Sequence, residues 1–131
     1  MQIDGACLCG KITYEADTVL ICHCSDCQVN SASAYGVVVG VTDGQFRLLT
    51  GTLKEYEKTA DSGRKRQLSF CPECGTRIHA RAKGNPKAFF RLRVGTIRQR
   101  ASLEPKIQYW CNSALPRTSD LSEILRHDTQ N

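Results

Sequence analysis

The chain has 131 residues, a length typical of one domain, and we expect residues 1–131 to form a single domain. Hydrophobic residues make up 40% of it and charged residues 24%, which argues against intrinsic disorder. The formal charge of +5 is unevenly spread, since residues 64–106 carry twelve Lys or Arg and two Glu, whereas residues 1–63 carry four basic and eight acidic residues. The basic half could bind an anionic substrate or a nucleic-acid backbone, or it could be a solvated face that offsets a thiolate cluster.

Short alternating or β-branched runs closed by turn residues recur along the chain, and they predict a mainly β, antiparallel fold. The expected strands are residues 11–16, 35–41, 46–49, 53–58, 68–70, 77–82 and 89–94. The runs 46–49 and 53–58 flank Thr50-Gly51-Thr52 and are expected to pair as a hairpin. Gly84-Asn85-Pro86 indicates a turn.

Two short helices are expected beside these strands. One covers residues 27–34, and the other covers residues 120–125 and begins from a cap at Ser119 or Asp120. The rest of residues 118–131 is expected to be a loose tail.

Eight cysteines are the unusual feature of the composition. Residues 1–5 show no basic segment followed by an apolar run, and no stretch of the sequence approaches membrane-spanning length. We therefore expect a cytoplasmic protein without a membrane partner. In a reducing compartment, closely spaced cysteines are better explained by metal binding or redox chemistry than by structural disulfides.

Seven of the cysteines lie in three groups with chelating spacing: Cys7-Leu8-Cys9, Cys22-His23-Cys24-Ser25-Asp26-Cys27 and Cys71-Pro72-Glu73-Cys74. Two cysteines separated by two residues on a tight turn can direct both sulfurs at one ion, and Gly75 suits such a turn. Structural zinc commonly takes four thiolates from two turns of this kind. We therefore expect zinc, while the ligand type also allows an iron–sulfur cluster.

Counting ligands divides the seven sulfurs between two ions. The central group can supply three ligands to one ion, whereas each outer pair must find another pair. Cys7, Cys9, Cys71 and Cys74 then complete a tetrahedral site that joins the amino-terminal loop to a distant hairpin. Structural zinc contributes on the order of 10 kcal/mol to folding, so this first site is expected to be structural.

The second ion keeps Cys22, Cys24 and Cys27, which leaves a fourth position for water or a substrate. That arrangement is typical of a catalytic zinc. Two residues could close the site instead, namely His23, which lies between two ligands, and Cys111, the eighth cysteine. The expected total is two zinc ions per chain.

The order of these motifs resembles the glutathione-dependent formaldehyde-activating enzymes and their relatives, including centromere protein V. The shared motifs cover most of residues 5–110: Gly5-Ala6-Cys7-Leu8-Cys9-Gly10, Tyr14, the CHCSDC run, the Ser/Ala loop to Tyr35, Gly51-Thr52-Leu53, Tyr56, Phe70-Cys71-Pro72-Glu73-Cys74-Gly75-Thr76 and Val94-Gly95-Thr96. The resemblance implies an Mss4-like fold of stacked antiparallel sheets and the same division into a structural and a catalytic zinc. Gln28 and the glycine-free run 30–33 depart from the family pattern beside the open site.

The resemblance also implies a zinc-dependent enzyme of the carbon–sulfur lyase type. Its substrate would be an adduct of glutathione, or another small thiol, with an aldehyde, such as S-hydroxymethylglutathione. Zinc would stabilise the thiol as a thiolate and could polarise the carbonyl oxygen. Arg64, Lys65 and Arg66 could receive the glutathione carboxylates, or they could form a solvated loop.

The alternative is a non-catalytic, zinc-stabilised module that binds nucleic acid or another protein. Residues 89–93, Phe-Phe-Arg-Leu-Arg, favour it because aromatic rings beside arginines can stack bases. Their alternation argues against it, since Phe90 and Leu92 share one face of a half-buried strand and the arginines share the other. Nucleic acid is therefore disfavoured as a partner. Redox chemistry is a third possibility, but it requires sulfurs that no metal holds.

Four other residues could serve the site or have ordinary structural roles. His79 alternates with Ile78 in an expected strand, where a packed or surface histidine is the usual finding. Tyr109 and Trp110 could line a pocket or close the core, and Asp26 could orient a ligand or bond its own backbone. No general acid or base is assigned from the sequence.

Overall fold

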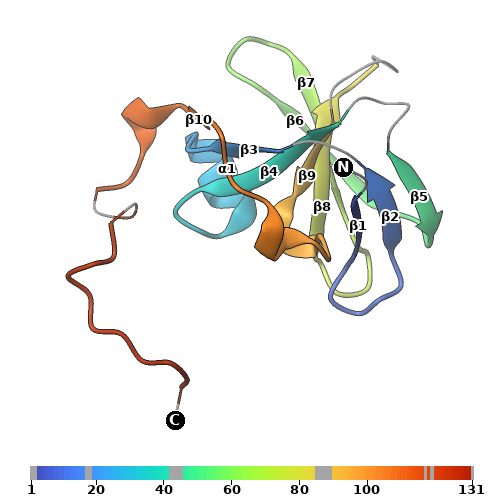
Figure 1. The fold of residues 1–131 in the computed structure, drawn as a ribbon. Coiled ribbons are helices and arrows are strands. Elements are labelled where there is room, and N and C mark those ends of the chain that lie inside the picture. Colours follow the sequence, from blue (N-terminus) through green and yellow to red (C-terminus); the bar gives the residue numbers. More distant parts are fainter. Residues whose placement is uncertain are drawn as a thin grey trace.

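The computed structural model describes residues 3–16, 19–41, 46–84, 90–116, 118 and 120–130. Two packed sheets form the framework of this part of the chain (Figure 1). The smaller sheet has the order β1-β2-β5, with β1 at Ile3–Ala6, β2 at Thr13–Ala16 and β5 at Arg47–Thr50. Both of its pairings are antiparallel. The mainly β fold that the sequence predicts is confirmed.

The larger sheet has the order β10-β3-β4-β9-β8-β7-β6. Its strands are β3 (Val19–Cys22), β4 (Gly36–Val41), β6 (Lys54–Thr59), β7 (Lys65–Phe70), β8 (Arg77–Ala82), β9 (Phe90–Arg93) and β10 (Gln108–Tyr109). Neighbouring strands are antiparallel except for β10, which pairs in parallel with β3. The register of these pairings determines which side chains share a face of the larger sheet.

The core lies between the two sheets. Ile3 and Tyr14 from the smaller sheet meet Val39, Ile78 and Leu92 from the larger one, and each of these side chains is at most 1% exposed. Alternate residues of a strand point to opposite faces, so one face of the larger sheet is covered in this way. Burying a side chain of this size contributes about 1.5–3 kcal/mol. The opposite face of the larger sheet is not covered by the smaller sheet.

The hairpin expected from residues 46–58 does not form. Its two strands exist, but β5 pairs with β2 and β6 pairs with β7, so they belong to different sheets. Gly51 has φ of +79°, and Thr50 Oγ1 donates a hydrogen bond to the Lys11 carbonyl at 3.1 Å. The short connection therefore carries the chain from one sheet to the other instead of folding it back.

One α-helix, α1 (Ser25–Ser31), lies in the described residues, where the sequence predicts a helix at 27–34. It begins at Cys24, whose sulfur accepts a hydrogen bond from the Cys27 N–H, and it ends at Ala32, which is left-handed with φ of 51°. Short 3₁₀ helices are η2 (Val94–Thr96), η3 (Arg100–Ser102) and η4 (Cys111–Ser113). None of the helices described is long and apolar enough to cross a membrane.

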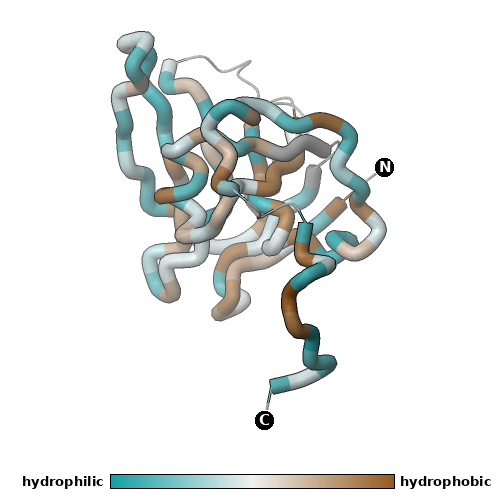
Figure 2. Tube along the Cα trace, turned by 90° about the vertical axis from the view of Figure 1, so that its left-hand side faces the viewer, coloured by the Kyte–Doolittle hydropathy of each residue, from teal (hydrophilic) through white to brown (hydrophobic). Residues whose placement is uncertain are grey.

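The helix expected at residues 120–125 is wrong, because these residues form only turns and bends. Leu121 and Leu125 are 63% and 83% exposed, and a short helix without a packed face is not stable in water. Residues 120–130 run away from the sheets in both views (Figures 1 and 2). The expected cap at Ser119, and Asn85, Pro86 and Phe89 of the expected turn and last strand, lie outside the described residues.

Candidate metal centres

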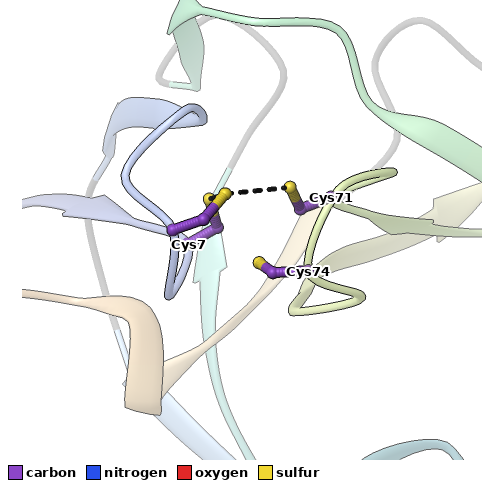
Figure 3. A group of neighbouring side chains, drawn as sticks. Cys7, Cys71 and Cys74 are labelled. Atoms are coloured by element: carbon purple, nitrogen blue, oxygen red, sulfur yellow. Dashed lines mark hydrogen bonds between the residues drawn. The ribbon is translucent and has the colours of Figure 1, made fainter.

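The first cysteine cluster joins two loops that are far apart in the sequence. Cys7 and Cys9 lie between β1 and β2, and Cys71 and Cys74 lie between β7 and β8. The second loop is a tight turn in which the Cys71 carbonyl accepts from the N–H of Gly75 at 2.9 Å. Gly75 has φ of +73°, a conformation that glycine adopts without strain. The turn directs both of its sulfurs at the opposite loop (Figure 3).

The four sulfurs of this cluster lie within 4.8 Å of one another. The Sγ atoms of Cys7 and Cys9 are 3.4 Å apart, and those of Cys9 and Cys71 are 3.7 Å apart. Four thiolates that surround zinc tetrahedrally at the usual bond length have sulfurs about 3.8 Å apart. The donor set and its spacing therefore fit a closed four-thiolate metal site.

Thr76 ties the two loops together beside these sulfurs. Its Oγ1 accepts a hydrogen bond from the Leu8 N–H at 3.1 Å and lies 3.1 Å from Cys74 Sγ. Hydrogen bonds from Thr76 lower the pKa of the Cys74 thiol to about 5, which favours the thiolate that a metal needs. The sequence analysis gave Thr76 no role, although it is the second residue after the last cysteine of the motif.

The second cluster lies where β3 ends and α1 begins. The sulfurs of Cys22, Cys24 and Cys27 come within 4.8 Å of one another, because Cys24 is the helix cap and Cys27 lies in the first turn. Cys24 Sγ accepts from the Cys27 N–H at 3.3 Å. A hydrogen bond from Cys27 lowers the pKa of Cys22 to about 5, and the positive charge of Arg91 acts in the same direction. Three thiol ligands are thus preassembled at one position.

Neither residue that could close this second cluster reaches it. His23 Nε2 is 2.7 Å from Gln108 Oε1, and its ring packs 5.2 Å from that of Tyr35. Cys111 Sγ donates to the Gln108 carbonyl at 3.7 Å and is exposed. Among the residues that the structure describes, no fourth His, Cys, Asp or Glu joins the three cysteines.

Gln28 has a structural role beside this cluster. Its side-chain amide donates hydrogen bonds to the His23 carbonyl at 2.9 Å and to the Ser113 carbonyl at 3.0 Å. The side chain therefore fastens η4 onto the start of α1.

The three basic residues before the second knuckle separate in the structure. Arg64 is exposed next to the turn that joins β6 and β7, and Lys65 pairs with Glu57 at 3.3 Å. Arg66 points to the face that carries the second cluster, because it pairs directly with Lys58, whose Nζ forms an ion pair with Asp26 on α1. Of the three, only Arg66 is brought to the site.

The other sequence candidates do not form part of either cluster. His79 is buried and packs edge-on against Phe46 and Phe90, and burial lowers its pKa to about 4. Tyr109 and Trp110 are 43% and 62% exposed, so they do not close the core. Both lie outside the lining of the cavity described next.

An open cavity of about 970 Å³ lies between the β1–β2 loop, the end of α1 and η2. Cys7, Thr96 and Arg93 contribute to its lining, but the three cysteines of the second cluster do not. The preassembled thiols therefore lie outside it, on the face of the larger sheet that is turned away from the core.

Two of three comparisons with known proteins give a match. A crystal structure of a Rhodobacter sphaeroides protein is similar in fold, with a TM-score of 0.59 and 19% identity over 80% of this chain and 97% of that chain. A search of curated proteins gives no match. Residues 2–113 match the sequence model of the glutathione-dependent formaldehyde-activating enzymes. The chain therefore belongs to the glutathione-dependent formaldehyde-activating enzyme family.

Proposed function

We propose that this protein is a zinc-dependent enzyme of the carbon–sulfur lyase type, acting on the adduct of a small thiol with an aldehyde. Glutathione and formaldehyde, and hence S-hydroxymethylglutathione, are the substrates that its family suggests. The observation that carries the proposal is the second cluster, in which three cysteine sulfurs converge and no fourth ligand joins them among the described residues. We also propose that the fold is Mss4-like and forms one cytoplasmic domain.

The two clusters are assigned different roles. Cys7, Cys9, Cys71 and Cys74 would hold a structural zinc, because four thiolates close the coordination sphere. Cys22, Cys24 and Cys27 would hold a catalytic zinc with one position open. Zinc held by these three cysteines would stabilise a bound thiol as its thiolate and polarise an aldehyde oxygen.

The reaction conserves atoms without a further reactant. The thiol sulfur forms a bond to the carbonyl carbon, the carbonyl π pair moves to oxygen, and the thiol proton ends on that oxygen. The chain contributes by holding the three cysteine sulfurs at fixed positions where β3 ends and α1 begins. Lys58 contributes by tethering Asp26, and with it the start of α1, to β6. Cleavage of the adduct is the reverse of these steps.

A nucleic-acid module has less support. Phe90 and Leu92 are 4% and 0% exposed, so the half-buried strand expected from their alternation is confirmed. Phe90 packs 5.1 Å from Phe46 in the core, where it cannot stack on a base. Of the two aromatic residues that favoured this alternative, Phe90 is thus used in core packing, and Phe89 lies outside the described residues.

Exchange between formaldehyde, glutathione and their adduct tests the proposed function directly. Magnetisation-transfer NMR on the equilibrium mixture measures the rate with zinc-loaded protein, with Cys24→Ser and without protein. We expect wild type to raise the exchange rate above the uncatalysed rate and Cys24→Ser to remove the increase. Equal rates in all three samples would reject the enzyme assignment.

A further inference from the structure

Three arginines share one face of the larger sheet with the second cysteine cluster. Directly paired residues of antiparallel strands point to the same face. Cys22 pairs with Gly36, and along β4 the residues two and four positions further, Val38 and Gly40, pair with Arg93 and Arg91. Arg91 is also paired with Ala80 on β8. The cluster and both arginines therefore lie on one side of the sheet.

Arg66 joins this face from the next strand. Ala80 pairs with Leu68 on β7, and Arg66 lies two residues before Leu68, so it points the same way. Arg66 also lies near the cysteines, because its pairing partner Lys58 forms an ion pair with Asp26, which lies between Cys24 and Cys27. Burial and the positive charge of Arg91 lower the pKa of Arg66, while Cys27 opposes this effect.

Small residues leave space between these charges. Gly40 on β4 and Ala80 on β8 are the direct neighbours of Arg91, and Ala82 on β8 is the direct neighbour of Arg66. At Gly36 the space is filled by Arg93, because a Cβ there would overlap Arg93 Nη1 and lie 3.2 Å from Cys27 Cβ. Arg93 Nη1 is buried and has no hydrogen-bond partner.

The charges of Arg66 and Arg91 are not neutralised by the carboxylates that the structure describes. Arg47, Arg81 and Arg98 each pair with an Asp or Glu, whereas in the described ranges Arg66 and Arg91 do not. Two guanidinium groups that repel each other on a half-buried face are stabilised by an anion that lies between them. Guanidinium is also the side chain best suited to hold a carboxylate with two hydrogen bonds.

We propose that Arg66 and Arg91 form a carboxylate subsite beside the second cysteine cluster, which selects acidic thiols over neutral ones. The inference rests on the proposed function, since it names the residues that determine which thiol the open site accepts. A thiol with a carboxylate several bonds from its sulfur could place the sulfur at the cysteine cluster and the carboxylate between the two arginines. Arg93 lies on the cluster side of this subsite.

Calorimetry on the zinc-loaded protein tests the subsite through affinity. The ligands are glutathione, its diethyl ester, which lacks both carboxylates, and 2-mercaptoethanol. We expect glutathione to bind at least about tenfold more tightly than the ester, and Arg66→Gln or Arg91→Gln to reduce glutathione affinity about tenfold each. The affinity of the ester should be the same for wild type and both variants, and so should the affinity of 2-mercaptoethanol.

Three controls separate the subsite from its alternatives. Arg64→Gln removes the same charge from the same hairpin but outside the face, and it should leave glutathione affinity unchanged. Arg66→Lys should recover part of the loss, and thermal melts should show that all variants are folded. Raising salt from about 0.05 to about 0.5 M should weaken glutathione but not ester binding.

S-methylglutathione makes the test independent of the metal, because it keeps both carboxylates but cannot supply a thiolate. Chemical-shift titration should show that it binds wild type and that Arg66→Gln/Arg91→Gln weakens this binding about tenfold or more. Equal affinity for glutathione and its ester, or unchanged S-methylglutathione binding in the double variant, would overturn the subsite. Failure of every thiol to bind would instead reject the proposed function, while S-methylglutathione would still decide on the subsite.

Discussion

Substitution of Cys71 by serine tests the structural role of the first cluster. Cys71 is fully buried, and its sulfur lies 3.7 Å from that of Cys9 although the two residues are 62 positions apart. A structural zinc contributes on the order of 10 kcal/mol, which is comparable with the whole net stability of a small domain, about 5–15 kcal/mol. We therefore expect Cys71→Ser to lose cooperative folding.

Cys24→Ser is the matched comparison at the second cluster. Cys24 caps α1 through its side chain, and serine is a good helix cap, so the substitution removes a metal ligand while it preserves the start of the helix. We expect this variant to unfold cooperatively and to bind one zinc ion fewer than wild type. Cys111→Ser, which changes an exposed thiol outside both clusters, should match wild type in both respects.

Thermal unfolding followed by circular dichroism, with zinc content measured on the same samples, distinguishes these outcomes. The expected order of stability is wild type and Cys111→Ser together, Cys24→Ser slightly below, and Cys71→Ser without a cooperative transition. Equal destabilisation by Cys24→Ser and Cys71→Ser would refute the division into a structural and an open site.

Three further predictions concern the fold around the sites. Burial holds the pKa of His79 near 4 rather than 6.5, so the unfolded chain takes up the proton first as pH falls. Stability should be fully present above about pH 6.5 and fall by up to about 3 kcal/mol towards pH 4, and urea unfolding should show a smaller fall in His79→Gln. Tyr14→Phe removes a buried hydroxyl that lies 2.6 Å from Thr96 Oγ1 and should cost about 1–2 kcal/mol in urea unfolding; no loss would contradict the role of this contact. Gln28→Ala should release η4, seen as faster proteolysis near Ser113, whereas an unchanged cleavage rate would count against that link.

Much of the fold could be predicted from sequence because strand alternation is a local signal. The valine-rich run 35–41 becomes β4, and residues 77–82 become β8. Strands β1, β3 and β10 were missed, because they are short and lack a clear alternation. The pairing of β5 was predicted wrongly, since the choice between two neighbours is made by the core that Leu48 packs against and not by the turn at Gly51.

The grouping of the seven cysteines could be predicted because the spacing within each motif is local and because counting ligands leaves the two outer pairs to combine. Their surroundings could not, because they depend on which strands become neighbours. Arg91 and Arg66 lie 25 positions apart in the sequence, and only the register of β7, β8 and β9 brings them to one face. Arg64, Lys65 and Arg66 form one basic run in the sequence. Which of the three side chains points to the second cluster depends on strand alternation, so the strand boundaries must be known first.

The seven clustered cysteines are expected to form two metal centres of different kinds. Native mass spectrometry of reduced, zinc-loaded protein measures this directly through the number of ions bound per chain. We predict two zinc ions in wild type and in Cys111→Ser, and one in Cys24→Ser. A single zinc ion in wild type, or two retained in Cys24→Ser, would show that the cysteines do not form two such centres.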